Sequence, residues 1–299
     1  MDGDAAGRRS TARTKGGRRA PAARGRGVYQ RVGTGVVWLV VAFNVFLLVW
    51  VIASSLKTSR EYAVDPWSLP TALRLDSYVR AWNVGNFAQA ALNTVLVVST
   101  AAVSVVAISA PAAYVLSRIP GRASSALILF FAIGIGLPNQ LVAIPLFFMF
   151  HPLGLTNNLL GLYLIYVAVS LPFTVFLLTG FFRSLPSSLE EAAAIDGCGS
   201  LMTFRLVMLP LARSGLLTAL ILNVVGLWSE LLFALVFIQS SGKETLSLAL
   251  LGLLQTFQYT GADWSLLFAG TCIVVLPIAL LYVWLGQRII EGMTLGSFR

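Results

Sequence analysis

The residue types that carry out most enzyme chemistry are scarce in this chain. It has one histidine, His151, and two cysteines, Cys198 and Cys272, among 299 residues. The two cysteines are far apart in the sequence, so we predict neither a disulfide nor a metal site. The phosphate-binding pattern Gly-x4-Gly-Lys-Ser/Thr does not occur, so the chain is not expected to bind ATP through such a loop. The remaining candidates are a few polar side chains in apolar surroundings and one acidic segment.

Glu230, Asn93 and Trp228 are the candidates in apolar surroundings. Glu230 is the one formal charge inside a long apolar run that could cross a membrane. Insertion scales put the cost of such a charge at about 2.5–3.5 kcal/mol, so Glu230 is expected to face a cavity, a partner or a protonating environment. Two interpretations stay open. Glu230 and Asn93, together with Trp228, line a path for a solute, or Glu230 and Asn93 form structural hydrogen bonds between helices.

The acidic segment, SLEEAAAIDGCGS from Ser188 to Ser200, holds three of the twelve acidic residues. Ser187 or Ser188 can cap a helix there, with acids in the first turn, where the helix dipole favours them, and glycines at its end: Glu190, Glu191, Gly197 and Gly199. A second helix is expected through LMTFRLVML until Pro210, whose missing N–H ends or kinks it. The pattern predicts two short helices that meet at an angle on a membrane surface.

Composition places these candidates in an all-α integral membrane protein. The mean hydropathy is +0.83, with 57% hydrophobic and only 11% charged residues, which is far from the range of soluble domains. Each span needs about 20 apolar residues. The turn signals HPLGLTNN at 151–158 divide the uncharged run 123–182 into two spans, and NFAQAALNT is interpreted as an interfacial lead-in to the span before it. Six spans are predicted: 31–57, 81–117, two within 123–182, 214–239 and 264–288.

The basic residues predict the orientation of these spans. Nine of the 21 Lys and Arg residues fall within residues 1–31, and the predicted loops leave sixteen on one side of the membrane and five on the other. Because Lys and Arg concentrate in cytoplasmic segments, both termini and the loop 183–213 are predicted to be cytoplasmic. The tail 1–31 lacks an apolar pattern and is predicted to be disordered. Such a tail could bind nucleic acid, but an anchor beside anionic lipid is the preferred interpretation.

The spacing around the acidic segment resembles the coupling motif of binding-protein-dependent ABC importer permeases, Glu-Ala-Ala-x3-Gly-x9-Ile-x-Leu-Pro. With valine in place of isoleucine, the matching residues are Glu191, Ala192, Ala193, Gly197, Val207, Leu209 and Pro210. The version EAAAIDG, with Asp196 before the glycine, is similar to the carbohydrate-uptake branch of this family. The alternative interpretation of the same residues is an ordinary amphipathic hairpin at the membrane surface.

Other segments between residues 76 and 293 resemble the second, six-helix permease of a sugar importer of the maltose-system type. They are LNTVLVV (92–98), AAYVLSRIPGR (112–122), PLGLTNNLLGLYL (152–164), WSELLFALVF (228–237) and RIIEGMTLG (288–296). Three features depart from that pattern: Cys198 replaces a usual alanine, Ser229 replaces a common asparagine, and the chain ends in GSFR. The resemblance implies the type I ABC importer permease fold for residues 32–299, with a coupling hairpin at 183–213 between spans four and five.

The function implied by the resemblance is mechanical, and the chain is not expected to be an enzyme. It would form half of a path for a sugar or oligosaccharide in the cell membrane, with no cofactor of its own, while a partner ATPase binds ATP and Mg. The implied partners are a second permease, an ATPase dimer, an extracellular solute-binding protein and lipid, but no nucleic acid. In the hairpin, Glu191 would make polar contacts to the ATPase, and Ala192 and Ala193 would allow close approach. Gly197 would set the angle between the helices, and Leu209 and Pro210 would fasten the second helix to the membrane.

Three alternatives of other kinds stay open at this point. A permease for a non-sugar solute would have the same hairpin and the same partners. A secondary transporter would use Glu230 as a proton or ion site, but such proteins are often built from internal repeats, and none is convincing here. A membrane-embedded enzyme would need several convergent polar groups, and the apolar runs supply one formal charge.

Overall fold

The computed structural model describes residues 24–260 and 263–294, and these contain helices but no strand. The chain divides into two units, residues 1–49 and 50–299. Helix α1 (Arg24–Ser55) begins inside the segment that was predicted to be disordered, and residues 1–23 of that tail lie outside the described residues. Its apolar part, Arg31–Ser55, is 25 residues long and is the first candidate span, as the sequence predicts.

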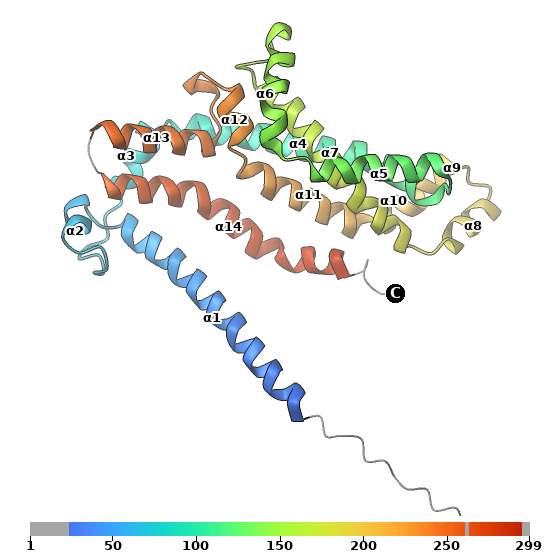
Figure 1. Ribbon diagram of the computed structural model, residues 1–299, viewed down its shortest axis with the longest axis horizontal. Helices are drawn as coiled ribbons and strands as arrows, with labels where there is room; N and C mark the ends of the chain where they lie inside the picture. The colour runs from blue at the N-terminus through green and yellow to red at the C-terminus, as the bar shows by residue number, and fades with distance from the viewer. Residues whose placement is uncertain (1–23, 261–262, 295–299) are drawn as a thin grey trace, which may run out of the picture. The chain divides into compact units, whose positions relative to one another are not determined.

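The second unit contains three further long apolar helices and two bent apolar pairs among its described residues, and the shorter elements are arranged around them. Figure 1 shows α4, α7, α11 and α14 extending along one another within this unit. The described helices after α1 are α2 (Ser59–Val64), α3 (Asp76–Val84), α4 (Phe87–Arg118), α5 (Arg122–Gly136), α6 (Asn139–Phe150), α7 (Leu159–Ser184), α8 (Ser188–Ile195), α9 (Ser200–Thr203), α10 (Leu209–Leu211), α11 (Arg213–Trp228), α12 (Leu232–Phe237), α13 (Leu246–Thr260) and α14 (Trp264–Thr294).

The core of the second unit forms where α4 packs along α7, with α5 and α11 against them. Small residues on α4 allow this close packing, because alanines at the contact let backbones approach one another; Ala101, Ala102 and Ala113 are all fully buried. On α11, Gly215 lies so close to Phe181 of α7 that a Cβ atom would fall 2.5 Å from the ring. Any larger residue at 215 would therefore push α11 away from α7.

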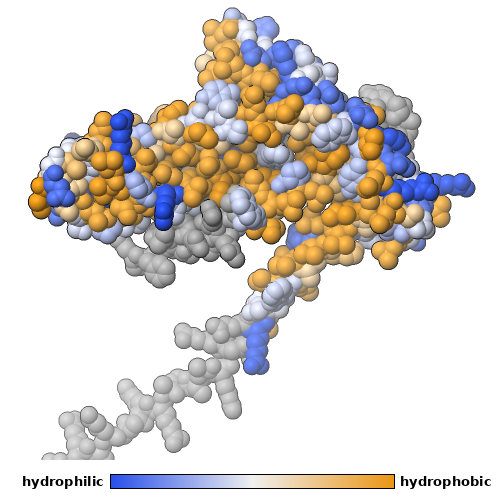
Figure 2. Space-filling view, turned by 180° about the vertical axis from the view of Figure 1, so that it is seen from behind, coloured by the Kyte–Doolittle hydropathy of each residue, from blue (hydrophilic) through white to orange (hydrophobic). Residues whose placement is uncertain are grey.

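Large apolar side chains cover much of the outside of the second unit, as Figure 2 shows for one face. Examples on four different helices are Leu92, Phe130, Phe176 and Leu280, all of which are exposed. A soluble protein rarely exposes apolar surface of this extent. The surface is that of a protein whose surroundings are lipid or other apolar helices.

Two of the candidate spans are bent pairs of helices. Helices α5 and α6 meet at 99° around Leu137 and Pro138, and the helix ending at Leu211 meets α11 at 72°. Four helices are long and apolar enough to cross a membrane, and the count reaches six if each bent pair is one span. The predicted division of the 123–182 run at 151–158 is confirmed, because a 3-10 turn ends at Leu153 and α7 begins at Leu159. The break at 137–138 was not predicted.

Two breaks follow helices that are shorter than a bilayer is thick: residues 137–138 after α5, and residues 229–231 after α11. Helix α5 has 15 residues and α11 has 16, which correspond to about 22 Å and 24 Å at 1.5 Å per residue. Both helices start beside the 183–213 hairpin, at Arg122 and Arg213. Since the hydrocarbon core is about 30 Å thick, neither helix reaches the far side before its chain breaks. The two breaks therefore lie at similar distances from the hairpin along their helices.

Three other predicted boundaries differ from the structure. The predicted fifth span, 214–239, ends as a helix at Trp228 and resumes as the short α12, because Ser229 and Glu230 interrupt it. Residues 246–260, predicted to lie in an outer loop, form helix α13. The supposed lead-in NFAQAALNT is the start of α4 itself, because buried Phe87 and Ala90 pack in the same apolar cluster as Ala269 of α14.

Candidate functional site

The first arm of the 183–213 hairpin is helix α8, Ser188–Ile195, as predicted. Ser187 occupies the N-cap position, but its side chain makes no capping hydrogen bond. Its backbone carbonyl instead accepts from the N–H groups of Glu190 (2.9 Å) and Glu191 (3.1 Å). Both acids lie in the first turn, where they interact favourably with the positive end of the helix dipole.

Gly197 ends this arm in a left-handed conformation, with φ of +79°. The N–H of Gly197 donates to the carbonyl of Ala194 (3.1 Å), and the N–H of Cys198 donates to the carbonyl of Ala193 (2.9 Å). This pair of bonds is the Schellman motif, which requires a positive φ at the residue after the C-cap. The sequence prediction of a glycine-specific backbone at this position agrees with the geometry.

The second arm runs through α9, a π-helical turn at Phe204–Met208 and α10. The N–H of Leu209 donates to the carbonyl of Phe204, and Pro210 lies in the first turn of α10, where a missing N–H leaves no hydrogen bond unmade. The prediction that Pro210 ends or kinks the helix is therefore wrong. The 72° bend comes after Leu211, where Ala212 interrupts the helix.

The second arm is fastened to the rest of the unit by apolar packing. Met208 and Ala212 are fully buried against α4 and α7, in a cluster that includes Ala113 and Phe182. Val207 and Leu209, predicted to be site residues, are half-buried against the same cluster, while Pro210 is exposed. Leu209 therefore packs against the chain itself, and the predicted role of Leu209 and Pro210, which is to fasten the second helix to the membrane, stays a prediction.

The predicted site residues on the first arm face in different directions. Glu191, Ala192, Asp196 and Gly197 are exposed, whereas Ala193 is buried. Ala193 packs into the chain itself, so its small size serves the internal packing of α8 rather than an open surface. Beside the exposed acids lie exposed apolar side chains, among which Ile195 is 87% exposed and Leu201 62%. The hairpin therefore presents a surface that mixes acidic and apolar groups.

Glu230 lies in the break between α11 and α12 and makes three hydrogen bonds within the chain. Its carboxylate accepts from the hydroxyl of Tyr166 on α7 (2.9 Å), from the N–H of Phe233 (2.8 Å) and from the N–H of Ala234 (3.3 Å). It therefore satisfies N–H groups that open the short helix α12, and it links that helix to fully buried Tyr166. This geometry agrees with the structural interpretation of Glu230.

Asn93 and Trp228 also use their polar atoms inside the chain. The amide of Asn93, which is buried, donates to the carbonyls of Gly242 (3.1 Å) and Glu244 (2.9 Å). The indole N–H of Trp228 donates to the carbonyl of Val274 on α14 (3.1 Å). The three candidates for a solute path thus take part in separate helix contacts.

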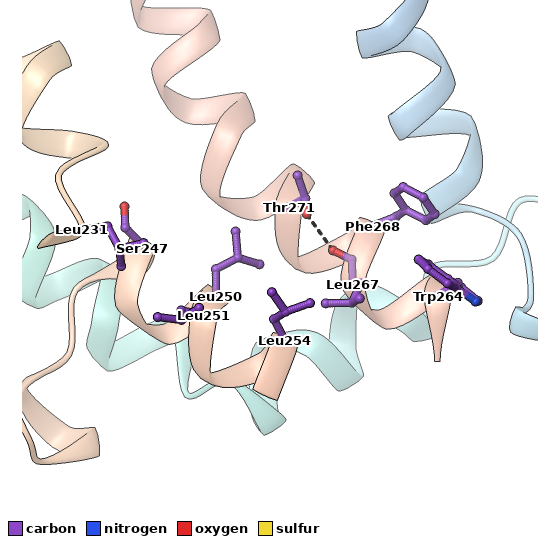
Figure 3. A pocket seen from close by; sticks show the side chains of 9 residues that line it. All are labelled: Leu231, Ser247, Leu250, Leu251, Leu254, Trp264, Leu267, Phe268 and Thr271. Carbon is purple, nitrogen blue, oxygen red and sulfur yellow. Dashed lines mark hydrogen bonds between the residues drawn. The ribbon is translucent and has the colours of Figure 1, made fainter. Parts of the chain in front are cut away.

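A pocket of about 350 Å³ lies between α13 and α14, beside the start of α12 (Figure 3). Its polar lining groups include the hydroxyls of Ser247 and Thr271, which donate to the carbonyls of Trp228 (3.0 Å) and Leu267 (2.9 Å). Most other side chains around it are apolar, namely Leu231, Leu250, Leu251, Leu254, Leu267 and Phe268. This wall suits an apolar group better than a polyol.

Two polar networks outside the hairpin were not predicted from the sequence. The side-chain oxygen of Asn157 accepts from the N–H groups of Gln239 (3.1 Å) and Ser240 (3.0 Å), and the Lys243 ammonium donates to the Asn157 carbonyl (2.7 Å). Asn157 has a φ of +51°. The Asn-Asn pair in LTNN, where a left-handed residue is best tolerated, was the available signal, but it names no partner.

The second network surrounds Asp263, just before α14. Its carboxylate accepts from the hydroxyl of Ser59 (2.5 Å), from the N–H of Leu266 (3.2 Å) and from the guanidinium of Arg80. Burial works to raise the pKa of Asp263, but these hydrogen bonds and the Arg80 charge outweigh it and hold the pKa below its usual value. The network joins α2, α3 and α14.

Comparisons with known proteins agree on one family. Residues 105–293 match the family described as binding-protein-dependent transport system inner membrane component. The diacetylchitobiose uptake system permease protein NgcG of Streptomyces coelicolor is 38% identical over 267 residues, which cover 88% of this chain and 86% of that protein. The sulfoquinovosyl glycerol transport system permease protein SmoH of Agrobacterium fabrum is 33% identical over 260 residues, covering 86% and 89%.

The fold is also similar to that of a solved structure. A chain in the crystal structure of a bacterial ABC transporter involved in the import of the acidic polysaccharide alginate superposes with a TM-score of 0.74. It is 19% identical in sequence, and the alignment covers 89% of this chain and 98% of that one.

Proposed function

Because this chain belongs to the family of binding-protein-dependent transport system inner membrane components, we propose that it is a permease subunit that imports a sugar or oligosaccharide. The observation that carries the proposal is the 183–213 hairpin. Its helix α8 has exposed Glu191 in the first turn and exposed Asp196 at the C-cap, and it is ended by the left-handed Gly197. Curated relatives named for diacetylchitobiose and sulfoquinovosyl glycerol uptake support the choice of solute class.

In this proposal the hairpin docks on a cytoplasmic ATPase. Glu191 and Asp196 supply polar contacts, Ala192 permits close approach, and exposed Ile195 and Leu201 add apolar contact. Closure of the ATPase dimer moves the hairpin, and the second arm passes that motion to the spans through its apolar packing. The result is a two-state, rigid-body change that exposes the path to alternate sides of the membrane. The chain itself contributes no ATP site.

The proposed assembly pairs this chain with a second permease, two ATPase subunits and an extracellular binding protein. The exposed apolar helix faces of the second unit support the need for a permease partner or lipid. The two breaks support it further, because broken backbone at membrane depth is tolerated only where protein or a water-filled cavity covers it. The path would lie at such a cavity between the two permeases.

The proposed orientation places both termini and the hairpin in the cytoplasm. The excess of basic residues on that side supports it. Contacts between the loops support it as well. Arg118, between spans two and three, is bonded to Glu190 of the hairpin, and both are assigned to the cytoplasmic side. On the other side, the loops that contain Asn157 and Lys243 are bonded to each other. Loops assigned to the same side are therefore neighbours in space.

Asn93, Trp228 and Glu230 would then shape the path without binding the solute directly. The polar contacts described above support this assignment, since each of the three side chains bonds to another part of the chain. A proton-coupled transporter would instead need Glu230 to be free to exchange protons with water.

The test is reconstitution of the purified complex in proteoliposomes. ATP-driven uptake is measured with diacetylchitobiose and a malto-oligosaccharide as probes, and with an amino acid as the comparison solute. We expect an ATPase to co-purify and a saccharide to accumulate only when ATP and the binding protein are present. If only the amino acid accumulated, the proposed solute class would be wrong, although the chain would still be an importer permease. Uptake driven by a proton gradient, without an ATPase, would overturn the proposal.

A further inference from the structure

The two arms of the hairpin are attached to the bundle in different ways. The second arm inserts Met208 into the apolar cluster with α4 and α7. On the first arm, α8, the one buried side chain is Ala193, whose small size provides little contact area. Movement of α8 relative to the bundle is therefore opposed by few apolar contacts, and a polar connection takes their place.

That connection is Arg118, at the end of the 32-residue helix α4. Its Nε donates to Glu190 Oε1 (2.8 Å), and its Nη2 donates to the backbone carbonyl of Leu185 (3.0 Å). Leu185 is the C-cap residue of α7, and Glu190 is in the first turn of α8. One guanidinium thus holds the start of the hairpin at two points, three residues before and two residues into α8.

The ion pair between Arg118 and Glu190 is largely buried, but its position suggests a role beyond stabilising the fold. The side chains of Arg118 and Glu190 are 19% and 21% exposed. For a pair in such a position, the loss of hydration offsets much of the attraction between the charges, so its net effect on stability is small. Its geometry is specific, however, because the planar fork of arginine fixes two acceptors at once, which the single ammonium of lysine does not.

The adjacent acids Glu190 and Glu191 consequently differ in their surroundings. Glu190 turns toward Arg118, while Glu191 is exposed. The coupling motif includes Glu191 and not Glu190, so the inward acid is not explained by contact with an ATPase. A helix that is pushed on its outer face by a partner needs a connection on its inner face if the push is to reach the spans.

We propose that Arg118 is a positioning residue that makes α8 and α4 move as one body, so that motion of the hairpin reaches the second span directly. The inference rests on the proposed function, since it assumes an ATPase that moves the hairpin. In this arrangement Glu191 receives the motion, and Glu190 with Arg118 transfers it to α4. Apolar packing of the second arm transfers it separately to α4, α7 and α11.

The experiment measures a distance inside the full complex in nanodiscs. Spin labels are attached to cysteines at Ala194 on α8 and Ala88 near the far end of α4, both exposed, after Cys198→Ser and Cys272→Ala. The distance is compared without nucleotide and with ADP and vanadate. In the wild type we expect one distance in both states. In Arg118→Ala we expect the nucleotide to change or broaden it, because α8 moves without α4.

Three further variants separate this role from a general loss of structure. Arg118→Lys keeps the charge but not both bonds, so it should fall between wild type and alanine. Glu190→Ala removes the other partner of the same ion pair. It should show the same change in distance as Arg118→Ala, and it replaces that variant in the test if Arg118→Ala assembles poorly. The control is Arg122→Ala, which should behave like the wild type. Arg122 lies four residues after Arg118, and its exposed side chain makes no hydrogen bond or ion pair with the described residues.

Transport supplies the second measurement. The number of solute molecules imported per ATP hydrolysed should fall about fivefold or more in Arg118→Ala, the low end of coupling between distant sites, while ATP hydrolysis continues. Wild-type distances and wild-type transport ratios in both Arg118→Ala and Glu190→Ala would overturn the proposal. If no ATPase co-purifies and ATP drives no uptake in the wild type, the proposed function itself has failed, which is a different result.

Discussion

Replacement of Gly197 by alanine tests whether the hairpin depends on the shape of its turn. A Cβ atom at Gly197 would meet nothing within 4 Å, but φ there is +79°, so the cost of alanine is backbone strain without a clash. A left-handed backbone costs an L-residue about 1–2 kcal/mol. A cost of one to two kcal/mol lowers the ratio of intact to opened hairpin by about 5- to 30-fold.

A series of variants separates this strain from other effects. Asparagine tolerates the left-handed region better than alanine, so Gly197→Asn should lose less than Gly197→Ala. Gly197→Pro should lose the most, because proline fixes φ near −65° and removes the N–H that bonds to Ala194. The matched control is Gly199→Ala: Gly199 has φ of −71° and open space around it, so alanine should cost little there.

The assay compares binding of the ATPase to membranes that contain equal amounts of each variant, together with solute-stimulated ATP hydrolysis. The expected order of activity is wild type and Gly199→Ala, then Gly197→Asn, Gly197→Ala and Gly197→Pro. If Gly197→Ala and Gly197→Pro bound the ATPase and supported uptake as well as the wild type, the turn would not matter and the docking role of the hairpin would be refuted.

Three more predictions concern other parts of the chain. Glu230→Gln should lower the thermal stability by about 1–3 kcal/mol, because one amide oxygen cannot accept all three bonds, and Tyr166→Phe should cost less because it leaves the carboxylate its two N–H donors; equal melting temperatures for wild type and Glu230→Gln would contradict this. Stability from the lowered pKa of Asp263 should be present at neutral pH and lost below about pH 4; Asp263→Asn should remove that part of the acid sensitivity in unfolding measured against pH, and an unchanged acid profile would count against it. A cysteine at Ala194 should be closed to an impermeant maleimide in intact cells while one at Thr156 reacts; equal labelling would reverse or remove the proposed topology.

The hairpin was the part of the fold best predicted from the sequence, because its signals are local. Acids in a first turn, an alanine run and a glycine at a fixed distance specify a helix and its end without reference to the rest of the chain. The same reasoning failed at Pro210, where the π-helical turn lets the helix continue. It also could not tell that Ala193 faces inward while Ala192 is exposed, since both sit in the same short run.

The interruptions of the spans were harder to predict, because hydropathy shows how long an apolar segment is but not where its helix axis changes direction. Pro138 marks a possible kink in the apolar run through Leu137, but the composition of the run does not give the 99° size of the bend. Helix α13 was taken for a loop because Lys243 and Glu244 precede it. The bond between Arg118 and Glu190 joins residues 72 positions apart, and a single sequence gives no sign of such a pairing.

The two breaks, after α5 and after α11, also bear on how the cell handles this chain. Glu230 accepts from two N–H groups after α11, but backbone groups at a break that lack such a partner find none in lipid tails, so a copy without its companion leaves them exposed inside the bilayer. Such a copy has not finished folding, although its spans are inserted. Assembly then acts as the last folding step, and membrane proteases that remove incompletely folded proteins should clear the surplus. The amount of this chain in the membrane should accordingly follow the supply of its partner subunit more closely than its own rate of synthesis.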